Sequence, residues 1–207
     1  MRKLILIFAA AFMLAACGGG TADKKADEAK AEEKSDAGSI AGGLSELAKA
    51  AESMGDKTEE LKKLTPLSTD ALKSFLPETL LGVKRSRFNV ANNMGFAVGE
   101  ATYKKDDTTD LKVMIYDCAG EAGAAFYGMN FFMRMNMQQE SEDGYTKTTE
   151  FMGSKAVENY KKYNNQYQLT FLSGERFLIS VEGDNTGLDA VKDAAKSLDY
   201  DKLKTLK

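Results

Sequence analysis

The sequence predicts an α+β fold in which an antiparallel sheet of about six to seven strands is covered by helices. Up to about residue 76, apolar residues recur at the spacing of helices, and from residue 84 they mostly alternate with a period of two. Short polar or glycine-containing turns separate the alternating segments, and strands joined by such turns pair antiparallel. Because helices must cover the sheet, we expect an α/β/α sandwich-like arrangement after an N-terminal signal peptide and a charged linker.

The N-terminus has the pattern of an export signal that ends at a cysteine. Two basic residues are followed by an uncharged apolar run over 4–16, which is shorter than the roughly 20 residues of a membrane-spanning helix. The run ends in Leu-Ala-Ala-Cys at 14–17, which resembles the lipobox of bacterial lipoproteins. The resemblance implies a signal peptide over 1–16, cleavage between Ala16 and Cys17, and anchoring in a lipid bilayer through acylated Cys17. An ordinary secreted protein with a chance cysteine is the alternative.

The same resemblance bears on which membrane holds the chain. Gly18 follows the cysteine, whereas aspartate at this position is associated with inner-membrane retention in enteric bacteria. If the source is Gram-negative, the resemblance therefore favours the outer membrane of the cell envelope, facing the periplasm.

A flexible, charged linker is expected over 17–39, starting at the lipidated cysteine. Three glycines follow Cys17, and the stretch 23–36 contains only Ala, Ser, Lys, Asp and Glu. A segment without large apolar residues cannot build a core, so its expected role is that of a spacer. A charged interaction tail is the alternative.

Ordered structure is expected to begin near residue 40 with an N-terminal helical segment over 40–64, followed by a single α+β domain over 65–207. A second, short helix is predicted over 70–76, with Ser68 as its N-cap and Pro77 closing it. The first helix is predicted from apolar residues at helical spacing, namely Ile40, Leu44, Leu47, Ala48, Ala51 and Met54.

The sequence from residue 84 onward predicts seven strands and two helices. One helix is expected over 124–138 and the other after residue 188. In the last strand Phe177, Ile179 and Val181 are expected on a buried face. The order of these elements resembles the PsbP/Mog1-like α/β/α sandwich of several bacterial lipoproteins, which implies a binding or assembly role. The expected strands are 84–90, 96–104, 111–117, 145–152, 155–162, 166–172 and 176–182.

Composition excludes several classes of function. The chain has no histidine, which excludes Ser-His-Asp and Cys-His nucleophile systems, HExxH zinc sites and imidazole general bases. After removal of the signal peptide, 26 of the 28 basic residues remain against 31 acidic ones, a net charge of −5 that argues against a nucleic-acid partner. Cys118 is the only cysteine besides Cys17, so no internal disulfide is expected, and we predict a buried, inert thiol.

The helix predicted over 124–138 carries the candidate interaction surface. Its apolar residues extend nearly all round, so it is expected to be either buried on both sides or partly exposed. A regular apolar stripe is more often core, and thioether ligands for Cu(I) are a further alternative. The residues proposed for an interaction surface are Phe126, Met129, Met133 and Met137.

No catalytic residue, metal ligand or cofactor is assigned from the sequence. Carboxylate pairs can hydrolyse glycosides, but the spacing of the candidates does not single out two of them. We therefore predict a membrane-anchored envelope lipoprotein that acts as a non-enzymatic binding or interaction module for an unknown envelope protein or small ligand. An envelope hydrolase using paired carboxylates, or a small-ligand or copper-binding protein, is the alternative. The scattered carboxylates are Glu100, Asp117, Glu150 and Glu158.

Overall fold

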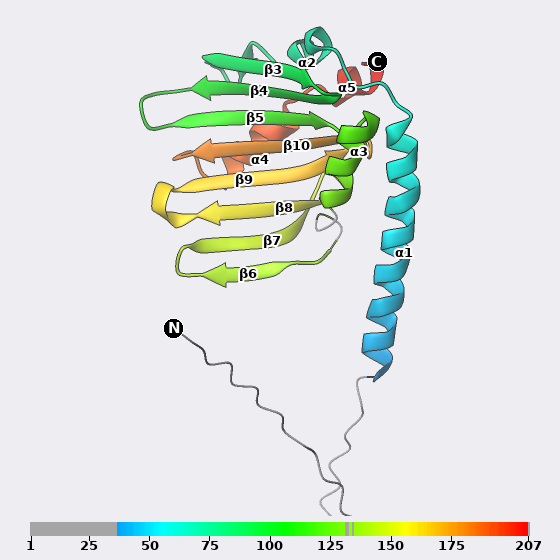
Figure 1. Ribbon diagram of the computed structural model, residues 1–207. Helices are drawn as coiled ribbons and strands as arrows, with labels where there is room; N and C mark the ends of the chain where they lie inside the picture. Colours follow the sequence, from blue (N-terminus) through cyan, green and yellow to red (C-terminus); the bar gives the residue numbers. More distant parts are fainter. Residues whose placement is uncertain (1–36, 131–132, 134, 207) are drawn as a thin grey trace, which may run out of the picture.

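The computed structural model describes residues 37–130, 133 and 135–206 (Figure 1). Cys17, the predicted signal peptide and almost all of the predicted linker lie outside the described residues. The fold is α+β, as predicted, and is built on an eight-stranded antiparallel sheet. In spatial order its strands are β3 (Arg87–Asn93), β4 (Phe96–Lys104), β5 (Asp110–Asp117), β10 (Phe177–Asp184), β9 (Gln166–Ser173), β8 (Ser154–Lys161), β7 (Gly144–Phe151) and β6 (Gln138–Ser141).

The prediction of six to seven strands is too low, because it missed strands whose sequences lack a recognisable apolar pattern. All four residues of β6 are polar and exposed, because β6 is an edge strand, so it lacks the apolar alternation that marks the others. A separate two-stranded sheet was also missed, because its strands β1 (Thr79–Leu80) and β2 (Val83–Lys84) have only two residues each.

The helix predicted over 124–138 is the second correction. The structure has α3 over Gly120–Met129, and the chain has entered β6 by Gln138. Asn130 ends the helix, because its side-chain Nδ2 donates to the Phe126 carbonyl at 2.7 Å and competes with continued helical hydrogen bonding. Met133 and Met137 therefore do not lie on α3 with Phe126.

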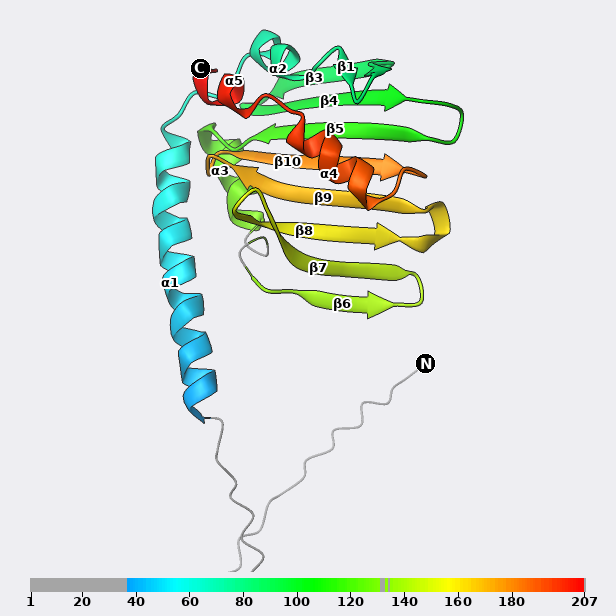
Figure 2. The ribbon, with the colours of Figure 1, turned by 180° about the vertical axis from the view of Figure 1, so that it is seen from behind.

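Three helices cover the upper part of one sheet face, and Figure 2 looks onto this helix-covered face. They are α2 (Thr69–Phe75), α4 (Leu188–Lys196) and α5 (Tyr200–Thr205). The hydroxyl of Ser68 caps α2 as predicted, by accepting a hydrogen bond from the Ala71 N–H at 3.2 Å. The predicted burial of β10 is also confirmed, with Phe177, Ile179 and Val181 inside the main apolar core beneath these helices.

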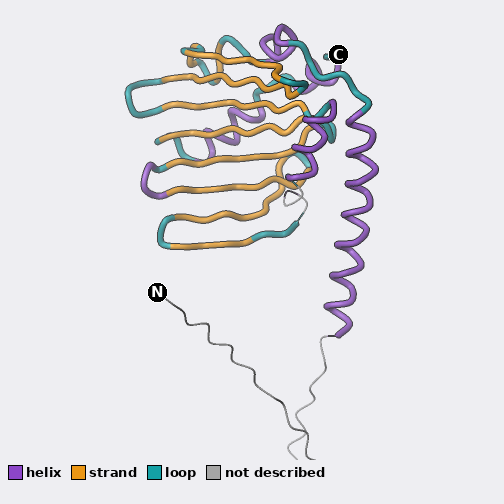
Figure 3. Tube along the Cα trace, viewed as in Figure 1, coloured by secondary structure: helices purple, strands orange, loops and turns teal. Residues whose placement is uncertain are grey.

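A second apolar cluster lies at one end of the strands, where α1 (Ala37–Lys62) packs against α3. Figure 3 shows α1 running across the strand ends, roughly perpendicular to them, and continuing past β6. Cys118 belongs to this cluster and is buried, as predicted, and burial raises the pKa of its thiol to about 12, which disfavours the reactive thiolate. The buried members are Leu61, Cys118, Ala124, Tyr127, Met133, Val157 and Leu178.

A buried ion pair fixes the connection between α1 and α2 to the sheet. Asp117 at the end of β5 is fully buried and accepts Arg176 Nε at 2.7 Å and Nη2 at 2.8 Å. The Leu67 N–H donates to the same carboxylate at 2.8 Å, and Arg176 Nη2 donates to the Thr65 carbonyl at 3.0 Å. Every charge and backbone group in this network has a partner, which gives Asp117 a structural role in this connection.

Candidate binding face

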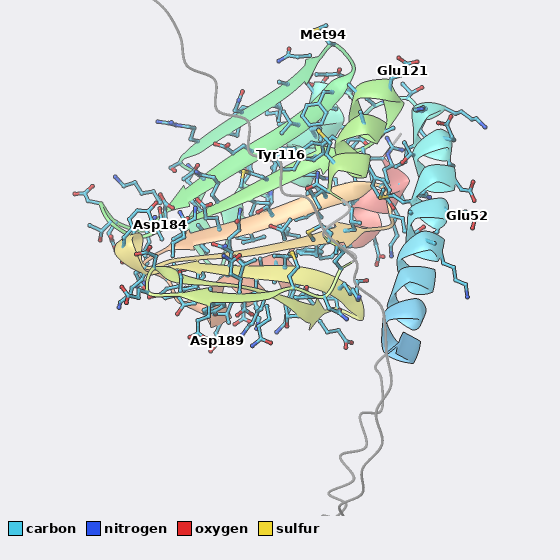
Figure 4. The ribbon with its side chains drawn as sticks, turned by 60° about the horizontal axis from the view of Figure 1, so that its bottom comes forward. Glu52, Met94, Tyr116, Glu121, Asp184 and Asp189 are labelled. Atoms are coloured by element: carbon cyan, nitrogen blue, oxygen red, sulfur yellow. The ribbon has the colours of Figure 1, made fainter. Side chains whose placement is uncertain are left out.

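The sheet face opposite α2, α4 and α5 is the face seen in Figure 1, and we call it the open face. Side chains alternate between the two faces along each strand, and β4 and β5 show this as strict alternation of buried and partly exposed residues. Among the described helices, only α3 covers part of the open face, at one end of the strands. In Figure 4, Tyr116 lies near α3, whereas Asp184 lies at the opposite end of the strands.

Strand register assembles a continuous polar row across the open face, with one residue from each of the eight strands. Residues directly opposite each other in an antiparallel pair share a face, so the pairing alone defines the row. All eight side chains are polar, and all are partly or fully exposed. In spatial order this polar row consists of Arg87, Thr102, Lys112, Glu182, Gln168, Asn159, Thr146 and Gln139.

Hydrogen bonds hold the two central amides of the polar row in place. Gln168 Nε2 donates to the Ser180 hydroxyl at 3.0 Å, and the Ser180 and Thr170 hydroxyls are 3.1 Å apart. Asn159 Nδ2 donates to Thr146 Oγ1 at 2.6 Å. Each amide thus uses one N–H within the protein, and its carbonyl oxygen has no hydrogen-bond partner among the described residues. The amides are oriented in advance and retain hydrogen-bonding capacity for a ligand.

The polar row ends in a hollow at the β6 side of the sheet. A cavity of about 180 Å³ is lined by Thr146 and Asn159 and by the neighbouring Gln139 and Lys161. A wider, open depression of about 600 Å³ lies where β6 leaves β7 and includes Thr148 and Met137. The open face is therefore indented where its hydrogen-bonding groups are most concentrated.

Carboxylates gather at the end of the open face away from α3. Asp110 and Asp184 lie directly opposite each other on β5 and β10. Burial, followed by the negative charge of Asp184, raises the pKa of Asp110 above its usual 3.8. Burial also raises the pKa of Glu182, although Lys112, 3.7 Å away, opposes this shift. We call the row that contains the two aspartates the outer row, and it comprises Lys104, Asp110, Asp184, Gln166 and Lys161.

The open face carries equal numbers of positive and negative side chains. The strand residues whose register places them on this face include five of each sign. The positive residues are Arg87, Lys104, Lys112, Lys155 and Lys161, and the negative residues are Glu100, Asp110, Glu150, Glu182 and Asp184. A surface of this kind does not favour a polymer of one charge.

The four residues predicted as an interaction surface have different environments. Met129 is 71% exposed at the end of α3, but Met133 is only 2% exposed within the second apolar cluster. Phe126 is partly buried against Phe96 and Tyr116, with ring centroids 5.1 and 5.0 Å away. Met137 also packs partly against that cluster. These residues close the α3 end of the open face rather than form one exposed stripe.

Glu158 is a second buried carboxylate, on the opposite face of the sheet. It is 1% exposed and accepts the Tyr145 hydroxyl at 2.7 Å, Lys147 Nζ at 3.0 Å and Lys192 Nζ at 3.3 Å. Burial alone would raise its pKa, but the hydrogen bonds from Tyr145, Lys147 and Lys192 outweigh burial and lower the pKa. Because Lys192 belongs to α4, this network joins α4 to β7 and β8 and is satisfied without a ligand.

The other carboxylates considered from the sequence do not come together. Asp117 and Glu158 are in separate ion-pair networks, while Glu100 lies on β4 and Glu150 is exposed on β7. The polar row was not recognised from the sequence, because its members are single polar residues on eight strands. Within the described part of the chain, no three His, Cys, Asp or Glu side chains are placed to hold a metal ion.

Comparisons of the chain with protein-family models, curated proteins and solved structures found no match in any of the three. Among residues 37–130, 133 and 135–206, no helix is long and apolar enough to cross a bilayer. Function is therefore inferred from the residues and their arrangement.

Proposed function

We propose that this protein is a membrane-anchored lipoprotein of the bacterial cell envelope whose domain is a non-enzymatic binding module. In this proposal 1–16 is the signal peptide, acylated Cys17 holds the chain in the outer membrane, and the charged linker over 17–39 lets the domain reach into the periplasm. The Leu-Ala-Ala-Cys sequence at 14–17 and the short apolar leader support the anchoring. Helix α1 is about 39 Å long, at about 1.5 Å per residue, and the part of it that continues past β6 lengthens the spacer.

The polar row carries the assignment of a binding module. Polar side chains from all eight strands are aligned on one uncovered face, and two amides are held ready by Ser180 and Thr146. The covered face already has an apolar core beneath three helices, so the open face is the surface left for a partner. Partners that use this face are an envelope protein or a small ligand.

Anchoring is tested by expressing the full gene and fractionating the envelope. The wild-type chain is expected in the membrane fraction with the mass of an acylated protein. Cys17→Ala should release it or leave it unprocessed, because the acceptor thiol is lost. A soluble wild-type chain, or unchanged membrane association and mass for Cys17→Ala, would contradict the anchor.

Binding through the open face is tested by crosslinking and recovery from envelope membranes. Lys112→Glu reverses a charge in the middle of the polar row, and Lys196→Glu makes the same change on exposed α4 as a matched control. A specific partner should be lost with Lys112→Glu and retained with Lys196→Glu. Equal recovery with both folded variants would exclude the open face as the binding surface.

The outer row favours an envelope hydrolase as a second candidate. The opposed residues Asp110 and Asp184 have Cβ atoms about 5 Å apart by the geometry of directly paired strands, and the pKa of Asp110 is raised. Glycosidases likewise use two carboxyl groups, one of which has a raised pKa. If the protein hydrolyses peptidoglycan or another glycan and Asp110→Asn abolishes this turnover, the protein is a hydrolase and not a non-enzymatic binding module. Absence of turnover under the same conditions would leave the binding module.

A further inference from the structure

The chemistry of the open face limits what can bind to it. Large protein interfaces usually have aromatic and apolar anchors at their centre, but the centre of the polar row consists of Lys112, Glu182, Gln168 and Asn159. Nucleic acids require a basic surface, whereas the positive and negative side chains of this face are equal in number. The groups of this face that remain available to bind a ligand are its closely spaced amides and hydroxyls.

We propose that the polar row binds an extended, uncharged glycan chain that runs across the strands. This inference rests on the proposed function, because it names the ligand of the same binding face. Sugar hydroxyl and acetamido groups both donate and accept hydrogen bonds, as do the side chains of Gln168, Asn159 and Gln139. The Lys112–Glu182 pair offers one donor and one acceptor side by side at the centre of the row.

The length of the polar row suits a polymer rather than a single sugar. Neighbouring strands are about 4.8 Å apart, so a row across eight strands spans about 34 Å. Each strand contributes one polar side chain, which provides a hydrogen-bonding position at every strand spacing. The small cavity lined by Gln139, Thr146 and Asn159 would accept a substituent at one end of the chain.

The amides of Gln168 and Asn159 are held in fixed orientations, which distinguishes the row from an ordinary polar surface. Ser180 is only 3% exposed, and its hydroxyl contacts both Gln168 and Thr170 from a position beside the row on the same sheet face. On the adjacent strand, Asn159 is held by its hydrogen bond to Thr146 within the row itself. Side chains held in this way lose less conformational freedom when a ligand binds.

The test is calorimetric titration of the full chain, purified in detergent, with chitohexaose as the uncharged probe and hexagalacturonate as the charged comparison. Chitohexaose should bind saturably, with an affinity that changes less than about twofold between about 50 and about 500 mM salt, because no ion pairs are formed. Gln168→Ala combined with Asn159→Ala should weaken binding at least about tenfold, since two hydrogen-bonding groups are removed. Lys196→Ala on α4 is the matched control and should leave binding unchanged.

Each outcome of this experiment separates the ligand from the function. If the double variant fails to fold, Gln139→Ala at the exposed edge replaces it and should weaken binding measurably. Absence of chitohexaose binding, binding of hexagalacturonate alone, or binding unaffected by the row variants would overturn the glycan assignment. If an envelope protein is nevertheless recovered through Lys112, the binding module stands and only its ligand class is wrong.

Discussion

Alternate residues of the same strands face the helices on one side of the sheet and the open face on the other. In β5, Val113 and Ile115 are fully buried in the main core, whereas Lys112 and Met114, which alternate with them, are partly exposed on the open face. Side chains on the helix-covered side are buried in the main apolar core. The open side retains hydrogen-bonding capacity, so substitutions on the two sides should affect different properties.

The largest loss of stability is expected at the end of β5, where the ion pair fixes the α1–α2 connection. Asp117→Ala should lower the free energy of unfolding by about 3–5 kcal/mol, because Arg176 and the Leu67 N–H lose a buried partner. Denaturant unfolding measures the change, with Asp193→Ala on exposed α4 as a matched control. A loss below about 1 kcal/mol would show that water replaces the carboxylate there.

The helix-covered side is tested by creating a cavity. Ile179 is fully buried, so Ile179→Ala should cost about 2–5 kcal/mol of unfolding free energy through lost packing. Ile179→Val removes a single methylene and should cost only about 0.5–1.5 kcal/mol. Equal effects of the two variants in denaturant unfolding would mean that this face repacks freely.

Glu158 gives the helix-covered side a defined pH response. Its pKa is lowered, so its ion pairs contribute stability above the unfolded value near 4.5, and this contribution is lost as pH falls through the folded pKa. Glu158→Gln should therefore destabilise the protein at pH 7, and the difference from wild type should shrink below about pH 4.5. Thermal unfolding across this range measures the effect, and a difference that does not depend on pH would contradict it.

Asp110 on the open face should respond in the opposite sense. Its pKa is raised by burial and by Asp184, so its ionisation destabilises the folded state at neutral pH. That cost is relieved as pH falls through the raised pKa. Asp110→Asn should consequently stabilise the protein at pH 7 and lose this advantage in acid. Loss of stability at pH 7 would indicate that the Asp110 charge has a partner that outweighs burial.

The smallest effect on stability is expected at the edge of the open face. Gln139 is exposed on β6, and Gln139→Ala should change the unfolding free energy by less than about 0.5 kcal/mol. Together with Ile179→Ala, this variant measures how far stability and binding are divided between the two sides. A loss above about 1 kcal/mol would mean that the row also holds the edge strand in place.

Local sequence patterns were sufficient for several elements of the fold. The alternation of buried and exposed residues in β4 and β5 can be read from adjacent residues alone. Ser68 and Pro77 likewise mark the start and end of α2 to within a few positions. The prediction of a helix over 124–138 was wrong, because the apolar residues of this stretch do not all belong to one helix and Asn130 ends α3. Strand β6 was missed because four consecutive polar residues carry no period.

The sequence by itself showed that this chain has no histidine and correctly predicted the α+β class and the burial of Cys118 and Ile179, whereas the leader that ends at Cys17 stays a prediction. Only the tertiary structure decided which sheet face stays open and which side chains meet on it. Strand β10 inserts between β5 and β9, so Glu182 lies between Lys112 and Gln168, which are far apart along the chain. The physical reason is that burial follows from local periodicity, whereas a row across a sheet follows from strand order and register.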